Sequence, residues 1–178
     1  MSEIFKTIRS RFPVNWLTLV IGWRGVGNRP RAVDLQDVKD FSADMLGRSG
    51  DVDCRVADLA TISERDEDRV ESILAKLAEE GAYPYDDESR KWMVVMLEQE
   101  LASLPADPLY ALLHLTDFWS EFGFPADSPH EVQGKGNNMT PTEYYTQETY
   151  DRLLGQHKSW LEREKARLSV RPEKASDP

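Results

Sequence analysis

The sequence predicts an all-α fold, a single-domain helical bundle of about seven helices. Apolar residues recur at three- and four-residue steps along most of the chain, whereas the strict alternation of a half-buried strand is hard to find. Capping residues precede these periodic segments, and glycine or proline follows several of them. With 178 residues, 40% of them hydrophobic, the chain is long enough for one sizeable core without disulfides. We therefore expect one domain over residues 1–170 and a disordered tail over residues 171–178.

The first half of the chain begins with an ambiguous apolar segment. Residues 14–23 are rich in β-branched and aromatic side chains, so they fit either a buried helix or an extended strand. Asp34 is a suitable N-cap for the next segment, in which apolar side chains fall on one side and Gly47 marks the end. The helices expected in this half, besides the ambiguous segment, are residues 34–46, 55–62 and 67–80.

The second half predicts three helices and a long loop. Asp107 followed by Pro108 is an N-cap with proline at the first helical position. Thr140 and Glu143 have the spacing of a capping box, which begins the longest helix. The segment 123–139 is rich in glycine, proline and asparagine and lacks periodicity, so we expect a long loop of the kind that is often functional. The helices expected in this half are residues 88–104, 108–121 and 141–168.

Acidic residues concentrate in the middle of the chain. Between Asp34 and Glu131 there are 24 acidic residues and 8 basic ones, a local net charge of −16 in a chain whose formal net charge is −10. Such a field disfavours nucleic acid and anionic membranes and favours a basic protein partner. Acids at helix starts also complement the helix dipole, which explains their position but not the shortage of lysine and arginine. The charge therefore points to a partner and not to a reaction.

Two groups of residues form the predicted partner-binding surface. Acids at two helix starts would attract a basic partner over a long range. Two phenylalanines where the chain enters the long loop would supply apolar anchors. The acids are Asp66, Glu67, Asp68, Glu71, Asp86, Asp87 and Glu88, and the anchors are Phe122 and Phe124.

No catalytic or metal-binding motif rises above chance. His114 and Asp117 are the candidate general base and its orienting carboxylate, because they lie three residues apart on one predicted helix. A histidine at the boundary of the core would look the same, and we favour that reading. The glycines in GWRGVGN match neither a dinucleotide-binding nor a P-loop pattern and indicate a turn. The three histidines have no helical spacing suited to a metal, so we expect no metal and no cofactor.

The N-terminal segment does not predict membrane insertion or secretion. Its longest apolar stretch, residues 16–21, is too short to span a bilayer. No small-residue cleavage pattern follows, since Arg24 and Gly25 come next. We therefore expect a bacterial-style cytoplasmic protein that does not bind a membrane. The sequence leaves its oligomeric state open.

Five stretches of the chain resemble a bacterial protein family. They are NWLTLVIGW near the start, RKWMVVML in the middle, DFWSEFGFPADSP, and the closing TPTEYY and WLEREKARL. These spaced tryptophan, glycine and proline anchors resemble the uncharacterised family called domain of unknown function twenty-two forty-seven, over most of residues 12–168. The family offers no catalytic residues to carry over. Similar small acidic bacterial proteins occur as immunity partners of polymorphic toxins, so the resemblance implies a basic toxin domain as partner. The chain departs from the expected pattern at GVGNRPRAV, where a shorter link is expected.

Three functions are consistent with these observations. The first is a binding protein, in its sharpest form an immunity protein that occludes a basic toxin domain. The second is a hydrolase-type enzyme that uses His114 and Asp117 in a groove bounded by the 123–139 loop. The third is a non-catalytic structural subunit whose acidic surface only maintains solubility. The charge distribution favours the first.

Overall fold

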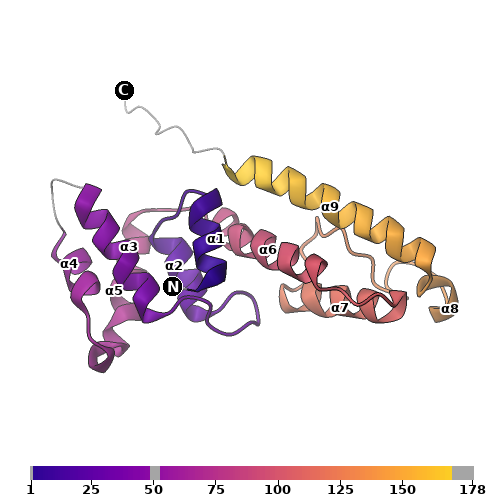
Figure 1. The fold of residues 1–178 in the computed structure, drawn as a ribbon, viewed down its shortest axis with the longest axis horizontal. Coiled ribbons are helices and arrows are strands. Elements are labelled where there is room, and N and C mark those ends of the chain that lie inside the picture. Colours follow the sequence, from indigo (N-terminus) through magenta and orange to yellow (C-terminus); the bar gives the residue numbers. More distant parts are fainter. Residues whose placement is uncertain (1, 49–52, 170–178) are drawn as a thin grey trace. The chain divides into compact units, whose positions relative to one another are not determined.

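A computed structural model describes residues 2–48 and 53–169 (Figure 1). Within these ranges the regular structure consists of nine α-helices and one 3₁₀ turn, with no strand. The all-α prediction is therefore confirmed. The two helices beyond the predicted seven are a short one at the start of the chain and a single turn split from the last helix. The predicted disordered tail, residues 171–178, lies outside the described residues.

Contacts between residues divide the chain into two compact units, Met1–Trp92 and Met93–Pro178. The boundary falls inside one helix, α6 (Tyr85–Ala102). The division rests on contacts inside each unit and does not test whether the chain is one domain. The single domain expected over residues 1–170 therefore stays a prediction.

In the first unit, five of the described α-helices and a 3₁₀ turn precede α6. They are α1 (Glu3–Arg11), α2 (Trp16–Arg24), α3 (Leu35–Arg48), α4 (Cys54–Thr61), the 3₁₀ turn η1 (Glu64–Asp66) and α5 (Asp68–Glu80). Helix α3 packs against α4, and α2 packs against α5. The predicted N-cap of α3 is confirmed, because the Asp34 carboxylate accepts the Asp37 N–H at 2.7 Å. Asp37 returns the bond by accepting the Asp34 N–H at 2.9 Å, which satisfies two free N–H groups at once.

The ambiguous segment 14–23 forms a helix, α2. It begins with a capping box in which the side chains of Asn15 and Thr18 each accept the other residue's backbone N–H. The helix is buried on most sides, which explains why its sequence shows no clear polar face. Gly22 gives the Trp92 ring room to approach, since a Cβ there would lie 2.3 Å from the ring. The Trp92 indole N–H donates to the Thr18 carbonyl at 3.1 Å and so fixes α2 against the first turns of α6.

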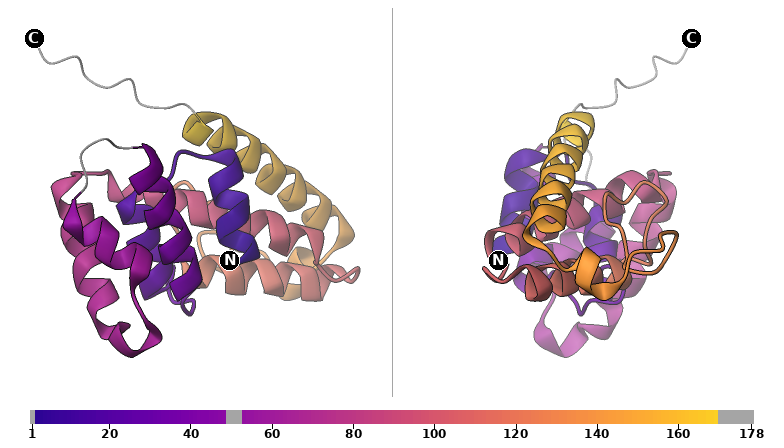
Figure 2. Two further views of the ribbon diagram at one scale, coloured as in Figure 1. Left: turned by 60° about the vertical axis from the view of Figure 1, so that its left-hand side comes forward. Right: turned by 90° about the vertical axis from the view of Figure 1, so that its right-hand side faces the viewer.

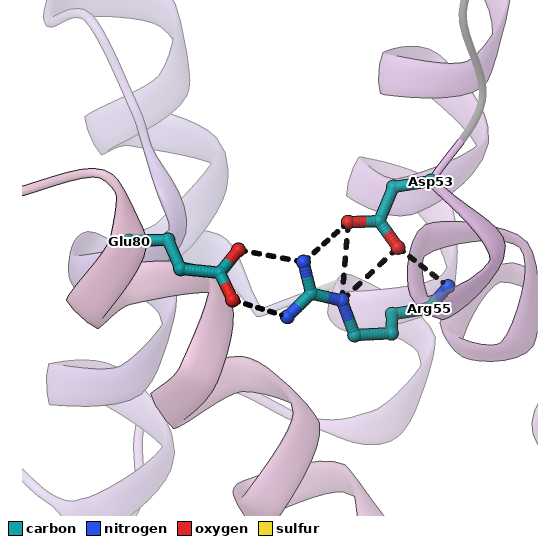
Figure 3. Close-up of polar contacts among 3 residues, drawn as sticks. All are labelled: Asp53, Arg55 and Glu80. Atoms are coloured by element: carbon teal, nitrogen blue, oxygen red, sulfur yellow. Dashed lines mark hydrogen bonds and ion pairs between the residues drawn. The ribbon is translucent and has the colours of Figure 1, made fainter.

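Arg55 joins the start of α4 to the end of α5 (Figure 3). Its guanidinium donates to the two Glu80 carboxylate oxygens at 2.7 and 2.6 Å. It also donates to the Asp53 carboxylate at 3.0, 3.1 and 2.5 Å, while that carboxylate caps α4 by accepting the Arg55 N–H. These hydrogen bonds hold the pKa of both carboxyls below their usual range.

The second unit contains the end of α6 followed by α7 (Pro108–Glu121), α8 (Pro141–Tyr144) and α9 (Gln147–Ser169). Helix α7 packs against α9. The loop predicted over residues 123–139 is confirmed, because no helix or strand lies between α7 and α8; it runs alongside α9 (Figures 1 and 2). The largest fully buried side chains of this unit are Trp119, Trp160, Tyr144, Phe118, Leu97 and Leu112.

Two predicted helix boundaries are wrong. Helix α6 begins at Tyr85 and not at residue 88, because the Glu88 N–H already bonds the Pro84 carbonyl at 3.3 Å. Acids in that first turn complement the helix dipole and favour the earlier start. The helix predicted over residues 141–168 is divided at Thr146. The Thr146 hydroxyl accepts the N–H of the third residue after it and begins α9 as a separate helix.

Candidate functional site

The acids predicted at the start of α5 are partly neutralised by arginines. The Arg24 guanidinium donates to Glu71 at 3.0 Å. The Arg31 guanidinium pairs with Glu67 and lies over the Trp23 ring, 3.2 Å from its centroid. Ion pairs of this kind cancel much of the local field that the sequence suggested. The remaining predicted acids that reach the surface of the first unit are Asp66, Asp68, Asp86 and Asp87.

Glu88, which was predicted to lie on the acidic surface, is buried in the core. Its side chain is buried, with 3% of the residue exposed. The Thr18 hydroxyl donates to it, and the Lys91 ammonium, also buried, pairs with it at 2.6 Å. Lys91 donates in addition to the Pro13 carbonyl at 2.7 Å. Glu88 faces the core because it lies three and four residues before Lys91 and Trp92, on the buried side of α6. It is therefore a structural residue of the first unit.

The two predicted aromatic anchors are half-buried. Phe122 lies against Phe118, with ring centroids 4.9 Å apart. Phe124 follows Gly123 in a left-handed turn, with φ of +50° and +70° respectively, which redirects the chain at the end of α7. The Lys135 ammonium lies 4.9 Å from the Phe124 ring centroid. Both rings thus contact their own unit and present only part of their area to a partner.

Helix α7 carries a surface that sequence reasoning missed. Leu109, Tyr110 and Leu113 expose 38%, 59% and 38% of their area. His114 and Asp117, also exposed, continue the same stripe one turn further along the helix. We call these five residues the α7 face. Large exposed apolar side chains in one contiguous group are typical of an interaction surface.

The α7 face was hidden in the sequence by apolar residues all around the helix. The stretch LYALLHL offers leucines on more than one side, and periodicity alone does not tell which side meets the core. In the structure the opposite side is buried and contributes Ala111, Leu112, Leu115, Phe118 and Trp119. One sequence feature could have indicated this surface: the apolar residues span more of the helix than a single buried face needs, so some of them must remain exposed.

The α7 face lies in the most one-sidedly acidic part of the chain. From Met93 to Gly134 the sequence has seven acidic residues and no lysine or arginine. The acids are Glu98, Glu100, Asp107, Asp117, Glu121, Asp127 and Glu131. Any basic group that meets this helix must therefore come from elsewhere in the chain or from a partner.

The candidate catalytic pair does not assemble. The His114 ring is half-exposed, and its Nδ1 lies 3.5 Å from a Glu100 carboxylate oxygen. Within the described residues, His114 and Asp117 form no hydrogen bond or ion pair with each other. A groove of about 630 Å³ in the same unit is lined by other residues. The hydrolase hypothesis therefore gains no support from this geometry.

Two other histidines are buried between α7 and α9. His157 Nε2 accepts the Trp119 indole N–H at 2.8 Å, and its Nδ1 lies 2.6 Å from the Leu153 carbonyl. An indole can only donate and a carbonyl can only accept, so the proton of the neutral ring sits on Nδ1. Burial lowers the pKa of His157 to about 4. His157 is therefore a satisfied core residue.

His130, unlike His157, has one ring nitrogen without a hydrogen-bond partner among the described residues. Its Nε2 lies 2.8 Å from the Thr116 hydroxyl oxygen, while that hydroxyl donates to the Leu112 carbonyl at 2.9 Å. The Thr116 proton is thus engaged, so Nε2 carries the imidazole proton and Nδ1 is left with a lone pair. Among the described residues this buried Nδ1 has no hydrogen-bond partner. Burial, followed by the nearby His157, lowers the pKa of His130 to about 3.

The family comparison covers nearly the whole chain. A family model described as "Uncharacterized protein conserved in bacteria (DUF2247)" matches residues 5–165. The chain belongs to this bacterial family. No curated protein and no solved structure matches the DUF2247 chain significantly.

Membership in DUF2247 confirms the resemblance and brings no catalytic residue with it. In residues 2–48 and 53–169, no three His, Cys, Asp or Glu side chains are grouped so that they could hold a metal ion. None of the helices described combines the length and the apolar character needed to cross a membrane. The surface features of the second unit are therefore the strongest guide to function.

Proposed function

We propose that this DUF2247 member is a cytoplasmic binding protein whose α7 face docks a basic protein partner. One observation carries the proposal: Leu109, Tyr110 and Leu113 are exposed on a helix within a segment that has seven acids and no basic residue. Apolar anchors surrounded by charge of one sign are the arrangement expected of a specific docking surface.

The anchors would supply most of the affinity. Tyr110 is the most exposed of the three, and tyrosine is enriched among interface residues whose truncation is costly. Its ring buries apolar area while its hydroxyl keeps a hydrogen bond, and it loses little conformational entropy on binding. The two leucines flank it one turn apart and would exclude water from the contact. A partner that fits here presents an apolar pocket or a small apolar patch.

The acids would supply orientation and rate. Asp117 lies on the α7 face itself, and the formal net charge of −10 extends the attraction beyond it. The exposed acids of the first unit, Asp66, Asp68 and Asp86, add to the negative charge of the chain. Complementary charge raises the association rate and rejects acidic partners, including nucleic acid. The partner is therefore expected to present a basic surface around its apolar patch.

The narrower form of this proposal is an immunity protein that neutralises a basic toxin domain. The acidic composition and the exposed anchors support it, since an inhibitor of a basic enzyme needs both steering and a tight central contact. A toxin-encoding reading frame directly beside the gene would favour this form over a general binding role.

Capture from native lysate with matched variants tests the proposal. The double variant Tyr110→Ser/Leu113→Ser removes two anchors from the exposed side of α7, and Asp66→Ser/Asp68→Ser removes two exposed acids from the first unit. We expect the wild type and the first-unit variant to retain the same basic protein, and the α7 variant to lose it, with an affinity at least about tenfold lower. Recovery of neutral or acidic proteins only, or equal recovery by all three forms, contradicts the proposal.

A further inference from the structure

A second surface of the same unit has the features of a small-ligand site. A groove of about 630 Å³ lies between residues 128–131 of the long loop and one side of α9. Grooves of this volume are typical of small-molecule sites. Its α9 wall consists of Arg152, Gly155, Gln156, Ser159 and Arg163, which follow one another at helical spacing. We call it the α9 groove.

Gly155 is not required by the fold. It lies in the interior of the 23-residue helix α9, where glycine is destabilising relative to alanine. Its φ is not positive, and a Cβ built on it would meet no atom within 4 Å. Gly47 also has free space, but it lies at the end of α3, where glycine is common. The space at Gly155 belongs to the α9 groove, where a side chain would occupy it.

The α9 groove carries a net positive charge in an acidic molecule. Arg152 is neutralised by Glu131, which accepts two hydrogen bonds from its guanidinium at 2.6 and 3.0 Å. Arg163, in contrast, makes no hydrogen bond or ion pair with any residue that the structure describes. The Gln156 amide is likewise unengaged within residues 53–169. The Gln156 amide and the Arg163 guanidinium therefore both line the groove as available donors, two turns of α9 apart.

The wall behind the α9 groove contains the unsatisfied histidine. His130 lines the groove, is 8% exposed, and holds the buried Nδ1 that lacks a partner among the described residues. Buried polar atoms in folded proteins nearly always have a partner, so an exception needs a cause. A bound water or ion is a recognised cause of such an exception. Because Nδ1 can only accept, it would meet an oxyanion through a water, or through a protonated oxygen of the ligand, that donates to it.

We propose that the α9 groove binds a small oxyanion ligand, a carboxylate or a phosphate, held by Arg163 and Gln156 and lying over Gly155. The guanidinium plane matches the two oxygens of such a group and forms paired, charge-assisted hydrogen bonds with it. The Arg152–Glu131 pair fixes one wall of the groove. The site does not depend on the α7 face, which lies on exposed residues of another helix.

Titration of the full chain with two anions tests the site. The probes are inorganic phosphate and succinate, each at constant ionic strength balanced with chloride, followed by the amide and arginine Nε NMR signals of the ¹⁵N-labelled protein. We expect saturable shifts at Gly155, Gln156 and Arg163 with at least one of the two. Saturation by phosphate alone, by succinate alone or by both supports the site and assigns the class of anion. Shifts that follow chloride equally, or no saturable shift with either probe, overturn it.

Three single variants separate the site from general charge effects. Arg163→Gln should weaken binding at least tenfold without changing the melting temperature, because Arg163 is exposed and has no described partner. Lys158→Gln is the matched control, since it makes the same charge change on α9 outside the groove. Gly155→Ala should raise the melting temperature and yet weaken binding. Equal weakening by Arg163→Gln and Lys158→Gln overturns the role of Arg163, and unchanged affinity in Gly155→Ala overturns the position of the ligand.

Discussion

The two units differ in what their polar side chains contact. In the first unit, three of the seven acids that the sequence singles out pair with cations of the same unit: Glu88 with Lys91, and Glu67 and Glu71 with arginines. In the second unit, the α7 face exposes leucines and a tyrosine in a segment without basic residues, and Arg163 has no partner among the described residues. The difference teaches that a run of acids in a sequence overstates the free charge of a surface. Groups left unengaged by the fold are the better guide to function.

The largest expected effect comes from separating Glu88 from Lys91. Glu88→Ala leaves a buried ammonium with only the Pro13 carbonyl, and breaking a buried pair by removing one partner costs about 3–5 kcal/mol. Urea unfolding followed by circular dichroism measures the loss. Asp86→Ala, an exposed acid in the same first turn, is the control and should change stability by less than about 0.5 kcal/mol.

A double variant sharpens this test. Glu88→Leu/Lys91→Met replaces both charges by apolar groups, so no buried charge is left alone and much of the lost stability should return. Equal losses for Glu88→Ala and Asp86→Ala would show that Glu88 is a surface acid after all. That result would return it to the predicted steering surface of the first unit.

The next effect compares the two buried histidines of the second unit. His157→Leu leaves the Trp119 indole N–H without its acceptor, and an orphaned buried donor costs roughly 2 kcal/mol. His130→Leu removes the unpartnered Nδ1 together with the Nε2–H bond to Thr116, but the Thr116 hydroxyl keeps its own bond to the Leu112 carbonyl, so no buried donor loses its acceptor. We therefore expect a clear loss of unfolding free energy for the first variant and a smaller loss for the second. A loss of equal size in both would show that Nδ1 of His130 is satisfied in solution.

Acid should reveal the same two histidines. Their pKa values in the folded protein are about 4 for His157 and about 3 for His130, against an ordinary value near 6.5 in the unfolded chain. Between these values the unfolded chain binds protons that the folded protein excludes, so stability falls as the pH drops below 6.5. Each histidine should contribute a loss of roughly 1 kcal/mol between pH 7 and 5.5. Each His→Leu variant should flatten the pH dependence of urea unfolding.

Much of the fold follows from local signals in the sequence. Thr140 and Glu143 form the predicted capping box, and Asp107 with Pro108 begins α7 as expected. Asn15 and Thr18 would have identified α2 as a helix, because the same box needs only a side chain that accepts an N–H at each end. Such signals act over three or four residues, which is why they can be read without the tertiary structure.

The burial of a predicted site residue could be inferred from the sequence only where helical spacing places it on a clearly apolar face. Glu88 shares the buried side of α6 with Lys91 and Trp92, a helical spacing that was available in the sequence. The α7 face could not be predicted from the sequence, because leucines lie on several sides of the helix and only packing decides which of them remain exposed. His130 lies in a loop without periodicity, so its contact with Thr116 is beyond the reach of any local pattern.

The smallest expected effect is at the exposed Arg55 bridge of the first unit. Arg55→Ala removes a forked contact between α4 and α5, but its partners Asp53 and Glu80 are solvated, so the melting temperature should fall much less than in Glu88→Ala or His157→Leu. The pKa values of both carboxyls are lowered, so the contribution of the bridge is present near neutral pH and lost only as the pH falls through those lowered values. Arg69→Ala is the matched control, because Arg69 joins the same two helices through one exposed contact at 3.7 Å. High salt screens the Arg55 bridge, so the difference in melting temperature between the wild type and Arg55→Ala should shrink as salt is added. A loss of stability in Arg55→Ala larger than that in Glu88→Ala would contradict the ranking of buried over exposed ion pairs in this unit.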